Sequence, residues 1–93
     1  MSWIRGFAWD EDNLEHIARH QATAEEVEEV LTGDPLVLRG AEGRYLAYGK
    51  TASGRHLFAV YVPRGRGRVR VLTAREMTEK ETRLYRTKRK GKR

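Results

Sequence analysis

The sequence contains no cysteine and only two prolines among its 93 residues. The absence of cysteine excludes disulfide-stapled scaffolds and zinc sites with cysteine ligands. No apolar run approaches the ~20 residues that a membrane-spanning helix needs, and no basic start followed by an apolar stretch indicates a secretory signal. We therefore expect a cytoplasmic protein without a membrane partner.

The chain is short, and hydrophobic residues make up 39% of it. A chain of this length has room for one core, which must collect most of the apolar side chains. Residues 88–93 contain basic residues and glycine but no apolar side chain. We therefore predict one domain over residues 1–87, followed by a basic, disordered tail over residues 88–93.

Charge is divided unevenly along the chain. Residues 1–35 hold two basic and nine acidic residues, a net charge of −7, whereas residues 36–93 hold 17 basic and four acidic residues, a net charge of +13. This asymmetry favours a polyanionic partner for the second half, most simply nucleic acid. A solvated basic surface is the alternative interpretation.

Two helices are predicted before residue 35. The first has Asp10 as its N-cap, ends near His20 and carries apolar residues at helical spacing: Leu14, Ile17 and Ala18. The second begins with a capping box formed by Thr23 and Glu26 and ends at Gly33. Its buried face is formed by Val27, Val30 and Leu31.

The stretch from Arg44 to Arg75 is typical of three strands joined by two turns. Apolar and aromatic residues recur through residues 45–48, 57–62 and 69–72, separated by Ser53-Gly54 and by the sequence Arg-Gly-Arg-Gly at residues 64–67. Short strands are also expected at residues 2–8 and 36–38. A second capping box, from Thr78 to Glu81, predicts a C-terminal helix.

The turns allow a prediction of strand register. A hairpin closing around residues 52–54 sets Thr51 opposite Arg55 and Lys50 opposite His56, and a turn over residues 63–67 sets Val62 opposite Arg68 and Arg55 opposite Arg75. One end of the sheet would then collect Lys50, Thr51, Arg55, His56, Ala74 and Arg75. Such a group of cations suits a phosphate, although each side chain pointing into solvent is an equally open interpretation.

The three histidines have different expectations. His16 lies away from the clearest apolar positions of the first helix, and we expect it at the surface. His20 ends that helix, where it either complements the helix dipole or acts as a general acid or base. His56 lies among the cations and has the same two interpretations. His16 and His20 are spaced i, i+4, but without the accompanying glutamate of a metalloprotease motif no metal site is expected.

An ordered series of segments resembles the BrnT family of type II toxins. In the first half these segments are Phe7-Ala8-Trp9-Asp10, Asn13, Ala18-Arg19-His20, Glu25-Glu26 and Asp34-Pro35. In the second half they are residues 44–51, Ser53-Gly54-Arg55, Val60-Tyr61, residues 71–75, and residues 78–81 with Tyr85. The resemblance covers roughly residues 7–86. One difference is that the family usually has Lys-His-Gly where this chain has Arg19-His20-Gln21.

The resemblance implies an α+β, RelE-like fold, with two N-terminal helices packed on an antiparallel meander of about four strands, plus a C-terminal helix. It implies a metal-independent ribonuclease that stops translation, uses no cofactor and is neutralised by a BrnA-like antitoxin, with promoter DNA contacted only through the antitoxin complex. The implied catalytic residues are His20, Arg55 and Arg75. The residues assigned to RNA binding are Lys50, His56, Arg68 and Arg70.

The chemistry of RNA suggests roles for these side chains. The 2′-hydroxyl of RNA is itself the nucleophile, so an enzyme removes its proton, stabilises the charge on phosphorus and protonates the leaving 5′-oxygen. Arg55 and Arg75 suit the middle task because they stay protonated, and either His20 or His56 suits proton transfer. The alternatives are a non-catalytic nucleic-acid-binding module and an inactive toxin homologue that acts only through its protein partner.

Overall fold

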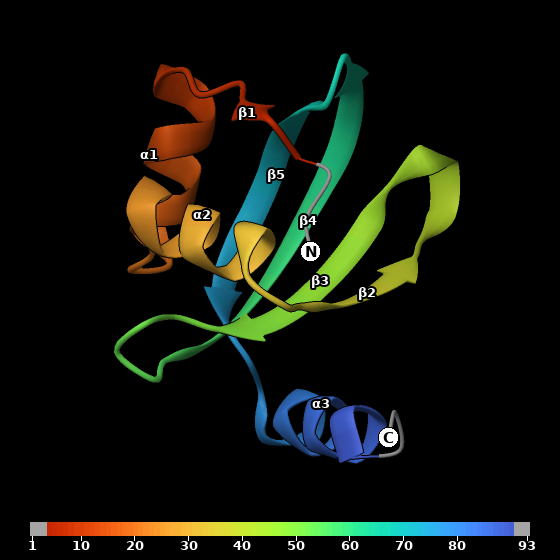
Figure 1. The fold of residues 1–93 in the computed structure, drawn as a ribbon. Helices are drawn as coiled ribbons and strands as arrows, with labels where there is room; N and C mark the ends of the chain where they lie inside the picture. Colours follow the sequence, from red (N-terminus) through yellow and green to blue (C-terminus); the bar gives the residue numbers. More distant parts are fainter. Residues whose placement is uncertain (1–3, 91–93) are drawn as a thin grey trace.

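The computed structural model describes residues 4–90 and consists of helices packed on one sheet (Figure 1). In chain order the elements are β1 (Gly6–Phe7), α1 (Glu11–Arg19), α2 (Ala24–Thr32), β2 (Leu36–Arg39), the short 3-10 helix η1 (Ala41–Gly43), β3 (Tyr45–Lys50), β4 (His56–Gly65), β5 (Arg68–Glu76) and α3 (Glu79–Lys90). The α+β class, the two N-terminal helices and the C-terminal helix are as the sequence predicts.

The three helices begin where the capping signals lie. Asp10 caps α1 by accepting a hydrogen bond from the backbone of Asn13, and Thr23 and Glu26 form the expected capping box of α2. Thr78 and Glu81 do the same for α3, with Thr78 N donating to Glu81 Oε1 at 2.8 Å. Each cap satisfies backbone N–H groups that have no partner within the helix.

The end of α1 has Gln21 at the position where the resemblance led us to expect a glycine. His20 is the C-cap, and Gln21 takes the left-handed backbone conformation with a φ of 63°. A glycine at this position adopts that conformation without strain, whereas glutamine carries a Cβ that opposes it. The helix therefore ends at the predicted place, at some cost in conformational energy.

The sheet has five strands in the order β1-β5-β4-β3-β2. Strands β2 to β5 form the predicted antiparallel meander. β1 adds a fifth strand, which pairs parallel with β5 through Gly6 and Phe7. It lies within the stretch expected to be a strand, of which residues 2 and 3 are outside the described residues.

The register of the first hairpin is as predicted, and that of the second is not. Lys50 lies opposite His56, but Val62 pairs with Arg70 and Arg75 pairs with Phe58, so the expected pairing of Arg55 with Arg75 is wrong. Two features displace the strands. Gly65 already pairs with Arg68, which leaves a tighter, two-residue turn of Arg66 and Gly67, and bulges interrupt the β4–β5 ladder in two places.

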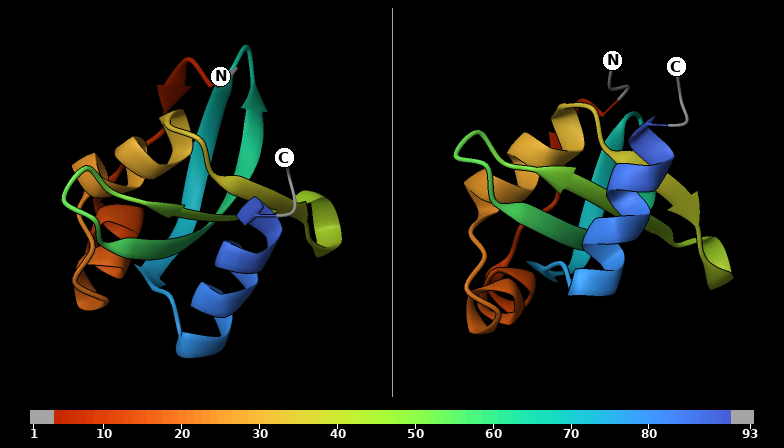
Figure 2. Two further views of the ribbon diagram at one scale, coloured as in Figure 1. Left: turned by 60° about the horizontal axis from the view of Figure 1, so that its bottom comes forward. Right: turned by 90° about the horizontal axis from the view of Figure 1, so that it is seen from below.

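The helices cover both faces of the sheet (Figures 1 and 2). On the face covered by α1 and α2, the main core contains Ile17, Ala22, Val27, Val30, Leu31, Ala47, Leu57, Ala59, Tyr61, Val69, Val71 and Ala74. On the other face, which we call the α3 face, α3 packs over a smaller cluster of Leu36, Tyr48, Phe58 and Tyr85. The alternation of side chains along β3, β4 and β5 divides the sheet residues between these two clusters.

The C-terminal helix is longer than the sequence indicates. α3 continues to Lys90, so residues 88–90, the first half of the expected tail, are helical. Residues 91–93 lie outside the described residues. No helix within residues 4–90 has the length and apolar composition needed to cross a membrane.

Candidate nucleic-acid interface

Four basic or titratable side chains gather on the α3 face at the end of the sheet where β3 meets β4. Lys50 and His56 are opposite each other in the β3–β4 ladder, and Arg75 is opposite Phe58, the next residue on this face of β4. The His56 ring lies edge-on to Tyr85 of α3, with centroids 5.9 Å apart, and Arg86 follows Tyr85. We call Lys50, His56, Arg75 and Arg86 the α3-face cluster.

The electrostatic environment of His56 favours a neutral imidazole. Partial burial lowers the pKa of His56 below its ordinary value of 6.5, and the positive charges of Arg86 and Lys50 lower it further. Lys50 and Arg86 form no ion pair within residues 4–90. The cluster therefore combines an uncharged proton acceptor with two cations free to bind an anion.

Arg75 lies on the same face but is held by a carboxylate. Its two terminal nitrogens donate to the carboxylate of Glu81 at 2.8 and 2.9 Å, and Nη1 also donates to the backbone oxygen of Glu76 at 3.0 Å. Its guanidinium carbon lies 4.5 Å from the centroid of the Phe58 ring. The Arg75 hydrogen bond lowers the pKa of the Glu81 carboxyl, so the carboxylate stays ionised beside Arg75.

Arg55 belongs to the opposite face. Its Nη1 donates to Glu26 of α2 at 2.8 Å, and its Nε donates to Glu76 Oε2 at 3.0 Å. Arg55 and Arg75 are thus at one end of the sheet, as predicted, but they extend toward different helices. They do not converge on a shared pocket, because the shifted β4–β5 register sets Arg75 opposite Phe58.

His20 and His16 lie at the edge of the sheet beside β5. Their rings are in edge contact, with centroids 5.4 Å apart, and His16 Nε2 is 3.0 Å from Thr73 Oγ1. His16 is therefore half-buried against β5, where the sequence predicts a surface position. Within residues 4–90, no group of three or more His, Asp or Glu side chains is arranged to hold a metal ion.

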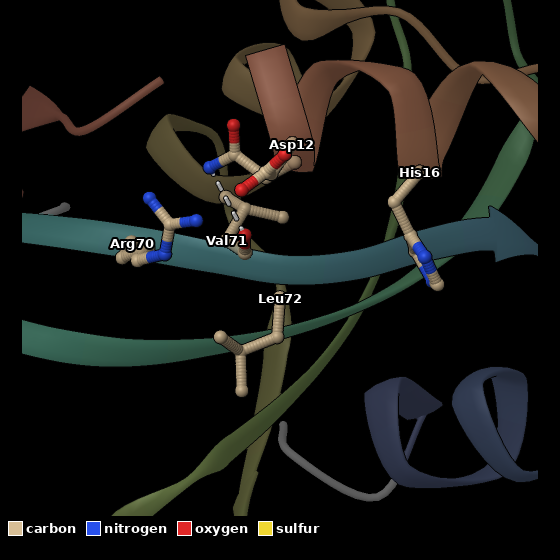
Figure 3. Close-up of a pocket in the computed structure, with 6 residues that line it drawn as sticks. Asp12, His16, Arg70, Val71 and Leu72 are labelled. Carbon is tan, nitrogen blue, oxygen red and sulfur yellow. Dashed lines mark hydrogen bonds between the residues drawn. The ribbon is translucent and has the colours of Figure 1, made fainter. Parts of the chain in front are cut away.

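A pocket of about 210 Å³ lies between α1 and β5 (Figure 3). Its lining residues are Asp12, Asn13, His16, Arg70, Val71 and Leu72. Arg70 bonds the N-cap Asp10 at 2.6 Å, and Asp12 adds a second carboxylate. Because its one arginine is already paired and an acid lines it, this pocket suits an anion less well than the α3-face cluster does.

The two remaining predicted RNA-binding residues lie toward the other end of β5. Arg68 is the first residue of β5 and is exposed, whereas Arg70 is paired with Asp10 as described above. The seven predicted site residues therefore fall into separate groups. The α3-face cluster holds Lys50, His56 and Arg75, whereas Arg55, His20, Arg68 and Arg70 lie elsewhere.

Arg86 and Asn13 are two residues of this region that the sequence does not single out. Arg86 follows the buried Tyr85, so an amphipathic reading of α3 would have set it at the rim of the helix–sheet contact. The Asn13 amide is buried and donates to the backbone oxygens of Ala8 and Val71 at 2.9 and 3.2 Å. It thereby supplies a hydrogen-bond donor to a backbone oxygen of β5 beyond the part that pairs with β1. No local sequence signal reveals this contact.

Comparison with known proteins identifies the family. The family model described as the ribonuclease toxin BrnT of type II toxin–antitoxin systems matches residues 9–81, from the start of α1 into α3. The crystal structure of the Brucella abortus ribonuclease toxin BrnT, at 1.1 Å resolution, is similar with a TM-score of 0.65 and 21% identity, covering 80% of this chain and 97% of that chain. No curated protein sequence matches. Because the family model spans most of the chain, this protein belongs to the BrnT family of ribonuclease toxins of type II toxin–antitoxin systems.

Proposed function

We propose that the protein is a metal-independent endoribonuclease that stops translation by cleaving RNA. The family supplies the class of reaction. The observation that carries the proposal for this chain is the position of His56, which lies opposite Lys50 and against the end of α3 that holds Arg86, two cations that form no ion pair within residues 4–90. A polyanion with a nucleophilic hydroxyl beside each phosphate is the substrate that such an arrangement suits best.

In the proposed mechanism, His56 accepts the proton of the 2′-hydroxyl as that oxygen attacks the adjacent phosphorus. The new O2′–P bond forms while the P–O5′ bond breaks, leaving a 2′,3′-cyclic phosphate and a 5′-hydroxyl. Lys50 and Arg86 stabilise the negative charge that grows on the phosphoryl oxygens. The Lys50 ammonium is also the candidate proton donor to the leaving 5′-oxygen.

The sequence-based roles of His20, Arg55 and Arg75 stay predictions. Arg75 fits the mechanism as a second anion-binding group, provided that RNA replaces the Glu81 carboxylate as its partner. Arg55 is bonded to Glu26 and Glu76, which favours a structural role. His20 lies beside His16 at the end of α1. The effect of replacing His20, Arg55 or Arg75 on the rate of RNA cleavage tests the role of each.

The direct test incubates the purified protein with RNA in excess EDTA and analyses the product ends. We expect cleavage to continue in EDTA, because side chains alone transfer the protons and stabilise the charge. The products should carry 2′,3′-cyclic phosphates, because the 2′-hydroxyl is the nucleophile. Lys50→Ala should cleave more slowly, because it removes a cation that stabilises the charge on the phosphoryl oxygens. Lys80→Ala, which removes an exposed cation at the start of α3, is its matched control and should keep the wild-type rate. Intact RNA, or cleavage that EDTA abolishes, would refute the metal-independent mechanism.

We further propose that a BrnA-like antitoxin neutralises the protein and that promoter DNA is contacted only through the antitoxin complex. A type II antitoxin is a protein, and an acidic segment laid over the α3-face cluster would compete directly with RNA for Lys50 and Arg86. Cleavage of cellular RNA would take place in the cytoplasm. Induced expression, with and without the antitoxin, tests this through the incorporation of labelled amino acids into protein.

A second candidate function is a non-catalytic module that binds nucleic acid or acts only through its protein partner. The observation that favours it is the pairing of Arg55, Arg70 and Arg75 with carboxylates. A binder would lose affinity and salt dependence together when Lys50 and Arg86 are replaced, whereas an enzyme would lose turnover far more than affinity.

A further inference from the structure

Four arginines meet at the β4–β5 turn, far along β5 from the α3-face cluster. We call Arg5, Arg64, Arg66 and Arg68 the turn cluster. All four are exposed, and none forms an ion pair within residues 4–90. Four like charges brought together without a carboxylate repel one another, so a bound polyanion would stabilise this end of the molecule.

The turn cluster is held on an ordered backbone. Gly65, Arg66 and Gly67 have φ values of 89°, 57° and 77°, and Arg5 N donates to Gly67 O at 2.7 Å. A Cβ added to Gly67 would lie 2.9 Å from Cγ of Arg5, so the arginine stem packs directly over the glycine. Because the frame is fixed before binding, little backbone entropy is lost when a ligand binds.

Arg68 of the turn cluster lies on the same face of the sheet as the α3-face cluster. It pairs with Gly65 of β4 and is followed by Val69, which points into the main core on the other face. Arg68 and Arg75 are seven residues apart on β5, which at ~3.3 Å per residue separates their backbones by about 23 Å. A stacked single strand advances about 3.4 Å per nucleotide, so several nucleotides span the distance.

The chemistry of the turn favours a nucleic-acid backbone over a protein partner. Residues 64–68 contain only arginine and glycine, whereas protein interfaces are anchored by buried aromatic and aliphatic residues. Guanidinium groups bind phosphates in bidentate geometry without regard to base sequence. Figure 1 shows the β4–β5 turn projecting at the opposite end of the sheet from α3.

We propose that the turn cluster binds the sugar–phosphate backbone of substrate RNA several nucleotides from the bond that is cleaved. This inference rests on the proposed ribonuclease function, because it extends the footprint of that substrate. It predicts that the turn cluster contributes to the binding affinity for long RNAs and not to that for short ones.

The test uses the full chain with the triple change Arg64→Gln, Arg66→Asn and Arg68→Gln, in which asparagine suits the left-handed conformation at residue 66. The matched control removes three exposed or partly exposed cations elsewhere, with Arg19→Gln, Arg39→Gln and Arg44→Gln. Thermal unfolding verifies that both variants fold. Binding is measured by fluorescence anisotropy with fully 2′-O-methylated RNAs of about four and about twenty nucleotides, which contain no 2′-hydroxyl nucleophile.

For the long RNA, we expect the turn variant to bind at least about tenfold more weakly than the control. Each phosphate contact to a single strand contributes ~0.7 to the slope of log affinity against log salt concentration, so losing three contacts should lower the magnitude of that slope by about two. The short RNA should bind, and in unmethylated form be cleaved, equally by both variants. Equal losses for short and long RNA, or a turn variant that matches the control, would overturn the proposal, as would loss of antitoxin binding with RNA binding retained. If the wild type cleaves no RNA, the ribonuclease proposal fails while this binding comparison still decides the inference.

Discussion

At the scale of single residues, the choice of proton acceptor is the central question. The sequence offers two candidates: His20, which ends a helix within a segment that resembles the family, and His56, which lies in a stretch rich in cations. The folded structure distinguishes them, because only His56 lies beside two unpaired cations on a sheet face. An imidazole kept neutral by its surroundings is ready to accept a proton at neutral pH.

The lowered pKa of His56 also makes a prediction about stability. In the unfolded chain His56 titrates near 6.5, and in the folded protein it titrates lower, so the unfolded state binds more protons between these two values. The free energy of unfolding should therefore fall as pH decreases from about 6.5 through the folded-state pKa. Urea denaturation of wild type and His56→Gln measures this, and the difference between their pH profiles should vanish above pH 7. An NMR titration giving His56 a pKa above 6.5 would contradict it.

Arg55→Ala should affect stability more than cleavage. The change removes the hydrogen bonds to Glu26 and Glu76 and leaves a partly buried carboxylate of α2 without its partner. We expect a loss of about 1–2 kcal/mol in the free energy of unfolding, measured by urea denaturation. Arg44→Ala, which removes an exposed ion pair of 3.7 Å to Glu42, should have little effect. Loss of cleavage by a fully stable Arg55→Ala protein would restore the catalytic role predicted from the sequence.

Gln21→Gly should stabilise the protein. Gln21 has a φ of 63° at the end of α1, and glycine removes the strain of a Cβ in that conformation. The expected gain is about 0.5–1 kcal/mol, reduced by the greater freedom of glycine in the unfolded chain. Gln21→Ala keeps the Cβ and is the matched control. Equal stabilities of the glycine and alanine variants would show that the backbone here is not strained.

At the scale of elements, the close contact between α2 and β3 depends on one glycine. A Cβ added at Gly49 would lie 2.9 Å from Cγ1 of Val30 and 3.5 Å from Cβ of Pro35. Gly49→Ala should therefore separate α2 from the sheet and cost about 1–3 kcal/mol in a thermal or chemical unfolding experiment. Gly6→Ala, where the new Cβ meets Arg68 Cγ at 3.6 Å, should be tolerated. Equal effects of the two changes would argue against this packing.

Local signals predicted the elements well and their register only in part. The caps at Asp10, Thr23 and Thr78 bond residues within one helical turn, so they can be predicted from the local sequence. The first hairpin was also predictable, because its short turn leaves one consistent pairing. In the second hairpin, the glycines of residues 64–67 mark the turn but do not fix which residues pair across it, and two bulges that the local pattern does not reveal shift the register.

At the scale of the whole molecule, the uneven charge of the sequence becomes a division between layers. Most acidic residues of the first half lie on α1 and α2 or at the N-cap of α1, and two of them pair with arginines at the sheet, as Asp10–Arg70 and Glu26–Arg55. Lys50 and Arg86 of the α3-face cluster and the four arginines of the turn cluster are among the cations that form no ion pair within residues 4–90. The sequence predicted a basic surface from net charge, but only the fold decides which cations are neutralised and which are free to bind RNA.

The central claim is that RNA is cleaved on the α3 face with His56 as the proton acceptor. The most direct measurement is the single-turnover rate of cleavage of one RNA in EDTA by wild type, His56→Gln and His20→Gln, with the folded state of each verified by urea denaturation. We predict that His56→Gln lowers the rate by about 10²–10⁴-fold while His20→Gln cleaves at close to the wild-type rate. A fully active His56→Gln protein, or a comparable loss confined to His20→Gln, would contradict the account.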